Sequence, residues 1–154
     1  MQMKSVHKII ATAFVATALA AVAPVWAGKK SKVDIEIREW NVTSSEEKVP
    51  AGDIEVTIRN KGKEVHEMVL MQLNTTDPVL HLPVDKNGAI DEKTMTFAKI
   101  VDETEGMEPG KHVKKALNLK PGRYAFVCNM VETEKDGSVE AHYSKGMAAQ
   151  LLVE

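Results

Sequence analysis

The chain has 154 residues, 27% of them charged, with a formal net charge of −2 and a single cysteine. This length accommodates one domain. The slightly negative charge argues against a nucleic-acid-binding protein, because such proteins need a basic face. A single cysteine also excludes an internal disulfide.

Residues 1–27 have the composition of a secretory signal peptide. Two lysines precede a nearly continuous apolar stretch over 9–22, and the small residues Val25 and Ala27 occupy the positions that a signal peptidase reads. The alternative is an uncleaved membrane anchor. We disfavour it because the segment is interrupted by polar residues and Pro24 and is shorter than the roughly 20 strongly apolar residues of a membrane span.

Cleavage near Ala27 would leave residues 28–154 as one folded domain that is periplasmic or secreted, without stable insertion in the membrane. In such an oxidising compartment a free thiol is expected to be buried, bound to a ligand or used in chemistry. The single cysteine is therefore a candidate functional residue.

Several short segments have the alternating or β-branched pattern of strands. Turn signals such as Pro50-Ala51-Gly52-Asp53 and Pro121-Gly122 separate them. Because there is no βαβ rhythm and no long amphipathic helix, we expect an all-β antiparallel sandwich. In chain order the expected strands are 33–38, 54–58, 65–73, 113–119, 124–128 and 147–153.

The segment 74–111 is richer in prolines and glycines than the rest of the chain. A loop of nearly 40 residues without secondary structure would be unusual in a compact domain. Within it, Asp91 can cap a helix that runs to about Thr104, with Met95 and Val101 on one side. We therefore predict a short helical insertion there.

Four side chains form a candidate metal site. Cys128, His142 and Met147 lie in the last part of the chain, and His66 lies near the start of an expected strand. A thiolate, two imidazoles and a weak axial thioether are the ligands of mononuclear copper sites that carry single electrons.

Three ordered motifs surround these residues: Asn60-x-Gly62 before His66, Pro121-Gly122-x-Tyr124 leading into Cys128, and Gly146-Met147 four residues beyond His142. In this ordered set the chain after residue 33 resembles the cupredoxins, the blue copper proteins related to plastocyanin and azurin. The resemblance implies a Greek-key β-sandwich. It also implies one type 1 copper ion held by the four side chains.

The spacing between two candidate ligands departs from plastocyanin and azurin. Thirteen residues separate Cys128 from His142, a much longer gap than in those proteins. Within it, Asp136-Gly137 is a hairpin-turn dipeptide, so we predict that 131–141 projects as a hairpin beside the metal. Its acidic residues are either a docking rim or an ordinary solvated loop, because lysines are interleaved with them; they are Glu132, Glu134, Asp136 and Glu140.

A second departure follows His66. Glu67 occupies the position at which plastocyanin and azurin have an asparagine. In those proteins that asparagine ties the two ligand loops together. The tie is therefore expected to be absent here or made by another group.

Other metal-binding side chains remain as alternatives. Met147 has the family spacing from the second histidine, but Met130, two residues after the cysteine, is a rival for the axial position. Met68 lies within an expected strand and is expected in the core. His81 and His112 lie at the edges of the loop region, where histidines are usually solvated.

Three classes of function are compatible with these residues. The first is an electron carrier that is not an enzyme. The second is a copper storage or delivery protein that uses the same ligands. The third is a hydrolase with Cys128 as nucleophile, which we disfavour because no oxyanion site or orienting group is marked in the sequence. For the electron carrier we expect a monomer and a redox protein partner, either a c-type cytochrome or a copper oxidase or reductase.

Overall fold

The computed structural model describes residues 30–154. The predicted signal peptide over 1–27 and its cleavage near Ala27 lie outside these residues. Between residues 30 and 154, no helix has the length and apolar character needed to cross a membrane.

The described residues form eleven strands and one short 3₁₀ helix, η1 (Tyr143–Lys145). All six strands expected from the sequence are present, with ends that differ by a few residues. The strands are β1 (Ser31–Arg38), β2 (Asn41–Ser44), β3 (Lys48–Val49), β4 (Gly52–Asn60), β5 (His66–Leu73), β6 (Ala98–Met107), β7 (His112–Leu119), β8 (Gly122–Val127), β9 (Val131–Thr133), β10 (Val139–Ala141) and β11 (Ala148–Val153).

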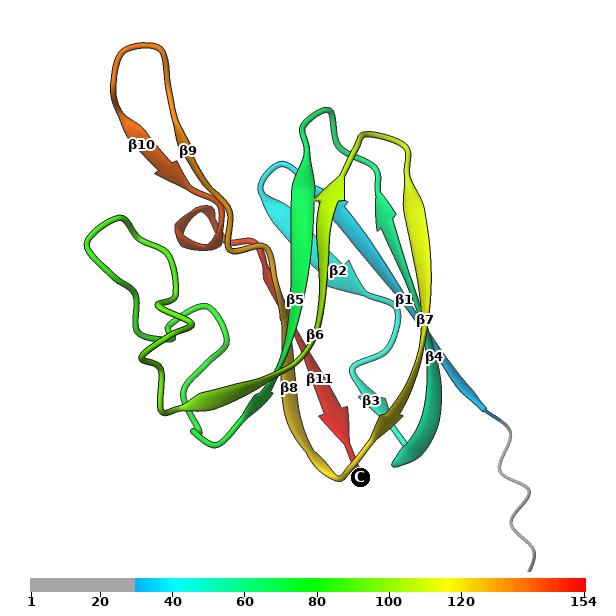
Figure 1. Ribbon diagram of the computed structural model, residues 1–154. Helices are drawn as coiled ribbons and strands as arrows, with labels where there is room; N and C mark the ends of the chain where they lie inside the picture. The colour runs from blue at the N-terminus through cyan, green and yellow to red at the C-terminus, as the bar shows by residue number, and fades with distance from the viewer. Residues whose placement is uncertain (1–29) are drawn as a thin grey trace, which may run out of the picture.

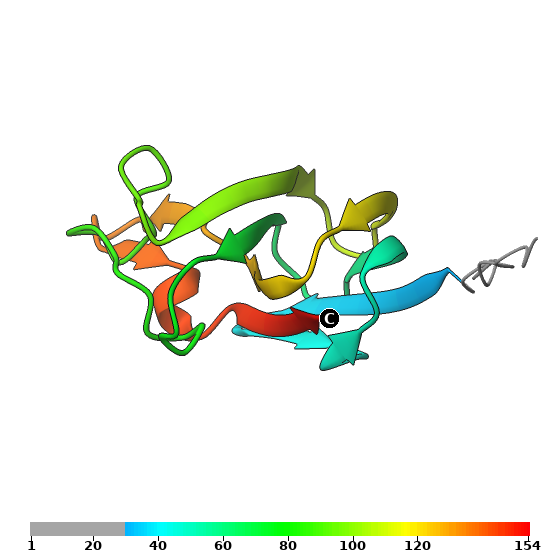
Figure 2. The same ribbon diagram turned by 90° about the horizontal axis from the view of Figure 1, so that it is seen from below.

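Two sheets pack as the layers of a sandwich (Figures 1 and 2). One has the strand order β2-β1-β4-β7, and the other has the order β3-β11-β8-β5-β6. Most neighbouring strands are antiparallel, but β1 with β4 and β3 with β11 are parallel pairs. The expectation of an all-β sandwich is confirmed.

The core between the sheets follows from period-two alternation. Val33, Ile35 and Ile37 of β1 are each 0% exposed, while the residues between them face outward. They pack in one cluster with Tyr124 and Phe126 of β8. Successive side chains of a strand point to opposite faces, which explains why these charged and apolar residues segregate.

The β5 and β8 strands are buried on both faces. Val69 and Met71 of β5 and Val127 of β8 point away from the main core, into a second apolar cluster. Leu82 and Ile90, from the long connection between β5 and β6, complete that cluster. The 74–97 connection therefore covers the outer face of the sheet. Figure 1 shows it lying to one side of β5 and β8.

The predicted helix from Asp91 to about Thr104 is wrong. Asp91 does cap a turn, because its carboxylate accepts hydrogen bonds from the Thr94 hydroxyl (2.6 Å) and from the Lys93 backbone N–H (3.1 Å). The chain then straightens, and β6 begins at Ala98 and pairs with β5. Pairing along an open strand edge outweighed a local capping signal, and 91–97 contains turns only.

The hairpin expected over 131–141 is confirmed. β9 and β10 pair in antiparallel register, with Val131 opposite Ala141. Gly137 adopts a left-handed conformation at the turn (φ = 85°), which a glycine does without steric cost. Figure 1 shows this hairpin projecting from one end of the sandwich.

The covering role of 74–97 predicts a difference between two leucines of that segment. Leu82 is 3% exposed and Leu80 is 51% exposed. Replacing Leu82 by alanine should lower the free energy of unfolding by about 2–5 kcal/mol, because it leaves a cavity. The matched change Leu80→Ala should stay within about 0.5 kcal/mol. Urea unfolding measures both, and equal effects would contradict the covering role.

Candidate metal centre

The sheet brings the sequence-predicted ligands to one end of the sandwich. His66 is the first residue of β5, Cys128 follows the last residue of β8, and Met147 precedes β11. These three strands are neighbours in one sheet and alternate in direction. The strand ends that carry these residues therefore lie at the same end of the sheet. His142 joins them from the C-terminal end of β10.

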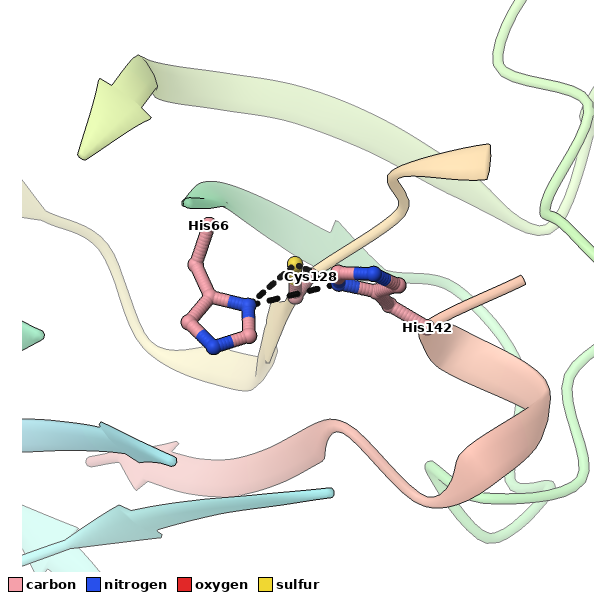
Figure 3. A group of neighbouring side chains, drawn as sticks. All are labelled: His66, Cys128 and His142. Atoms are coloured by element: carbon pink, nitrogen blue, oxygen red, sulfur yellow. Dashed lines mark hydrogen bonds between the residues drawn. The ribbon is translucent and has the colours of Figure 1, made fainter. Parts of the chain in front are cut away.

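Three of the four predicted ligands converge on one point (Figure 3). The Cys128 sulfur lies 3.3 Å from Nδ1 of His142 and 3.7 Å from Nδ1 of His66. The two Nδ1 atoms are 3.3 Å apart, and all three residues are 0% exposed.

These separations fit a first-row metal ion. Bonds of about 2.0–2.1 Å to nitrogen and 2.3 Å to sulfur, as for zinc, would place trigonal ligands roughly 3.5–3.8 Å apart. The separations of 3.3, 3.3 and 3.7 Å need only a small adjustment. A thiolate with two imidazoles is a donor set that suits copper.

Burial sets the protonation of two of these groups. It raises the pKa of the Cys128 thiol to about 11, and the nearby carboxylates of Glu67 and Glu132 add to this effect. Burial, together with the neighbouring His66, lowers the pKa of His142. The unmetallated site at neutral pH therefore holds a thiol beside a neutral His142 imidazole, whose nitrogen lone pair can bind a metal.

The axial position is less closely defined than the other three. Met147 is 0% exposed and belongs to the same apolar cluster as Cys128. Its carbonyl accepts the Cys128 backbone N–H at 3.0 Å. Met130 is half-buried at the edge of that cluster, and its carbonyl accepts the His142 N–H at 2.9 Å. The burial of Met147 favours it, and its ligation stays a prediction.

The other candidates lie elsewhere. Met68 is 1% exposed within the main core, as expected. His81 and His112 are exposed and lie outside the three-residue cluster.

A carboxylate joins the two segments that carry the candidate ligands His66 and Cys128. The Glu67 side chain accepts the backbone N–H of Asn129 at 3.0 Å. Glu67 directly follows His66 and Asn129 directly follows Cys128, so one hydrogen bond joins the two ligand segments. Of the two expectations, an absent tie or one made by another group, the second is confirmed.

The 74–97 connection holds the residue that follows the cysteine. The Asn129 side chain accepts the Ile90 N–H at 2.7 Å and donates to the Ile90 carbonyl at 2.9 Å. It also donates to the Glu92 carboxylate at 2.8 Å. The cysteine loop is thereby fixed on its outer side.

The same connection holds the residues that follow His142. The Tyr143 hydroxyl accepts the Leu82 N–H at 2.8 Å and donates to the Val79 carbonyl at 2.9 Å. The Ser144 hydroxyl donates to the Gly88 carbonyl at 2.5 Å. The sequence offered no signal for these contacts, because each depends on the path of a loop that no local pattern defines.

Neighbouring side chains enclose His142. The Trp40 ring meets its imidazole edge-on, with centroids 5.1 Å apart and an interplanar angle of 79°. Trp40 is half-buried, packed against the main core rather than inside it. Carboxylate oxygens of Glu64 and Glu140 lie within 4.8 Å of a His142 ring nitrogen. Nε2 of His142 is buried without a hydrogen-bond partner in the described part of the chain.

The fold and these donors define a cupredoxin. Residues 8–139 match the family model described as a cupredoxin-like domain. The chain therefore belongs to the cupredoxin-like domain family. The match includes His66 and Cys128 and ends before His142 and Met147.

Solved structures of two bacterial proteins, one of them described as a copper protein, share the fold. Auracyanin from the photosynthetic bacterium Roseiflexus castenholzii, in its dithionite-reduced form, is 21% identical, with a TM-score of 0.50 over 82% of this chain and 99% of its own. Rusticyanin from Thiobacillus ferrooxidans is 15% identical, with a TM-score of 0.52 over 83% of this chain and 79% of its own. No curated protein sequence matched the chain.

The pKa values of the site predict proton release on metal binding. At pH 7 the Cys128 thiol, with a pKa of about 11, must lose its proton to become a ligand, whereas His142, with its lowered pKa, is already neutral. Binding should therefore release about one proton from Cys128, and affinity should rise about tenfold per pH unit between pH 7 and that pKa. Calorimetry in buffers of different ionisation enthalpy measures this release. Cys128→Ser should abolish it, and unchanged release would contradict thiolate ligation.

Proposed function

We propose that the protein is a type 1 copper protein that carries single electrons between redox partners. The observation that carries the proposal is the convergence of Cys128, His66 and His142, whose donor atoms lie 3.3 to 3.7 Å apart in a fully buried site. Copper bound there would supply a one-electron Cu(I)/Cu(II) couple, with Met147 as the axial ligand.

The protein restrains the four side chains that would bind copper. Each is attached at or beside the end of a strand, and the bonds made by Glu67, Asn129 and Tyr143 restrain the residues next to them. A site that keeps one arrangement in both oxidation states has a small reorganisation energy, which favours rapid electron transfer. Complete burial also keeps water from the sulfur.

Copper storage or delivery is the second candidate. It uses the same ligands but requires copper that exchanges readily with other carriers. The complete burial of His66, Cys128 and His142 and their restrained loops favour retention of the ion. A thiol hydrolase is disfavoured further, because a buried cysteine with a pKa of about 11 is a poor nucleophile at neutral pH. We therefore propose a protein that is not an enzyme.

Export and partners complete the proposal. The sequence of residues 1–27 supports cleavage near Ala27 and a periplasmic or secreted location. The partner would be a redox protein, such as a c-type cytochrome or a copper oxidase or reductase, met by a monomer. The net negative charge disfavours nucleic acid as a partner.

A visible spectrum tests the proposed function. Cu(II) added to the purified protein should produce an intense blue or green band from charge transfer between the Cys128 thiolate and copper. Ascorbate should bleach the band and an oxidant should restore it. Cys128→Ser should not show it. A wild-type protein that stays colourless but binds Cu(I), and passes it rapidly to a chelator, would instead support copper handling.

Two methionine variants identify the axial ligand. Met147→Leu should keep the charge-transfer band but raise the reduction potential, because losing a thioether donor weakens Cu(II) binding more than Cu(I) binding. Met130→Leu should leave the potential near that of the wild type. Voltammetry measures both. The reverse pattern would make Met130 the axial ligand.

A further inference from the structure

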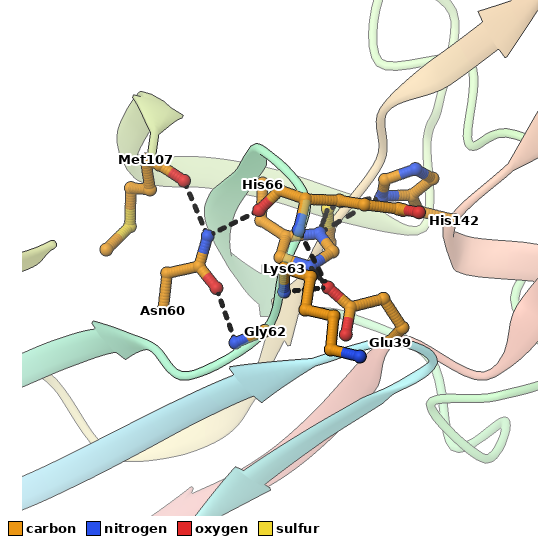
Figure 4. Close-up of polar contacts among 9 residues, drawn as sticks. Glu39, Asn60, Gly62, Lys63, His66, Met107 and His142 are labelled. Atoms are coloured by element: carbon orange, nitrogen blue, oxygen red, sulfur yellow. Dashed lines mark hydrogen bonds and ion pairs between the residues drawn. The ribbon is translucent and has the colours of Figure 1, made fainter. Parts of the chain in front are cut away.

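A carboxylate lies against the side of His66 that points away from the cysteine. Oε1 of Glu39 is 3.4 Å from Nε2 of His66. Figure 4 shows the two side chains directed toward each other. The imidazole is fully buried, whereas the Glu39 side chain is 23% exposed. A carboxylate beside Nε2 favours the tautomer with the proton on Nε2, which would leave the Nδ1 lone pair facing the Cys128 sulfur.

The backbone fixes the position of this carboxylate. The same Oε1 atom accepts the N–H groups of Lys63 at 2.6 Å and Glu64 at 2.9 Å. Partial burial alone would raise the pKa of Glu39. Hydrogen bonds from the backbone N–H groups of Glu64, Glu39 and Lys63, and from His66, outweigh it and lower the pKa to about 2.

The Asn60-x-Gly62 motif provides the space that the Glu39 side chain occupies. A Cβ atom at Gly62 would overlap the Glu39 carboxylate, so glycine leaves the space that the carboxylate fills. Asn60 holds the turn, because its side chain accepts the Gly62 N–H at 2.8 Å. It also donates to the carbonyls of Glu64 and Met107, each at 2.7 Å (Figure 4). Asn60 and Gly62 thus help to place Oε1 of Glu39 beside His66.

We propose that Glu39 is a positioning residue of the metal centre, whose carboxylate accepts the Nε2–H of His66, fixes its tautomer and orientation, and lowers the reduction potential. This proposal rests on the proposed copper function. Carboxylates that accept a hydrogen bond from a ligating histidine make the imidazole a stronger donor. A stronger donor with a nearby negative charge stabilises Cu(II) relative to Cu(I).

The variant Glu39→Gln separates charge from shape. Glutamine is nearly isosteric, and its amide oxygen can still accept the N–H groups of Lys63 and Glu64. Mutation of a carboxylate that accepts a hydrogen bond from a ligating histidine commonly weakens metal binding about 10- to 100-fold. If Cu(II) binding falls tenfold relative to Cu(I), the potential rises by about 59 mV. Voltammetry should show a rise of at least that size, and an unchanged or lower potential would overturn the proposal.

Two further variants serve as test and control. Gly62→Ala should displace the carboxylate from His66 while preserving the charge of the protein, so it should also raise the potential. Glu36→Gln removes a carboxylate on β1 that is 43% exposed and bonds no candidate ligand, so the potential should not move. A rise of equal size in Glu36→Gln would attribute the effect to net charge alone and overturn the proposal.

Nuclear magnetic resonance of the metal-free protein tests the bond separately from copper binding. The imidazole nitrogens of His66 should show the tautomer protonated at Nε2, with a slowly exchanging proton. Glu39→Ala and Gly62→Ala should speed that exchange. The opposite tautomer in the wild type would overturn the role of Glu39, even if copper binds. A wild-type protein with no thiolate-to-copper band would instead refute the proposed function.

Discussion

The site depends on one contact, between two imidazole nitrogens and a thiol sulfur that are fully buried from solvent. Nδ1 of His66 and Nδ1 of His142 face each other at 3.3 Å, with the Cys128 sulfur beside both. Buried polar groups are costly unless they are satisfied. With lone pairs directed at the same point, a metal ion satisfies all three donors at once, whereas protons satisfy them only in part.

Holding these donors in place requires support from outside the sandwich. Strands β5 and β8 bring two of them to one edge, but short strands fix only the backbone at their ends. The residues immediately after the three candidate ligands are Glu67, Asn129 and Tyr143. Each forms a hydrogen bond that spans more than 60 positions of sequence or reaches into the 74–97 connection. The 74–97 connection thus has two roles. It covers the apolar outer face of the sheet, and it restrains the segments that follow Cys128 and His142.

The sequence predicted six strands, the β9–β10 hairpin and the three converging side chains, but not β2, β3 or β6. Alternation marks β1 and β4, and the order of Asn60-x-Gly62, His66, Cys128 and His142 marks the site. It failed over 91–104, where a sound capping residue, Asp91, starts only one turn. Whether 98–104 forms a helix or a strand depends on the unpaired edge of β5, which is set by the tertiary structure. The contacts of Asn129, Tyr143 and Glu39 were invisible for the same reason.

Glu67 shows that a position can keep its contact while its chemistry changes. Its side chain, which is longer than that of asparagine, accepts the Asn129 N–H. An asparagine side chain would accept this N–H as a neutral group. The carboxylate makes the same tie, but its charge adds to the burial that raises the pKa of the Cys128 thiol. The metal-free thiol is therefore held more firmly in its protonated form, whereas a bound cation would turn the same charge into a stabilising one. The Glu67 carboxylate that joins the two segments thus disfavours a metal-free thiolate and favours the same thiolate with a cation bound beside it.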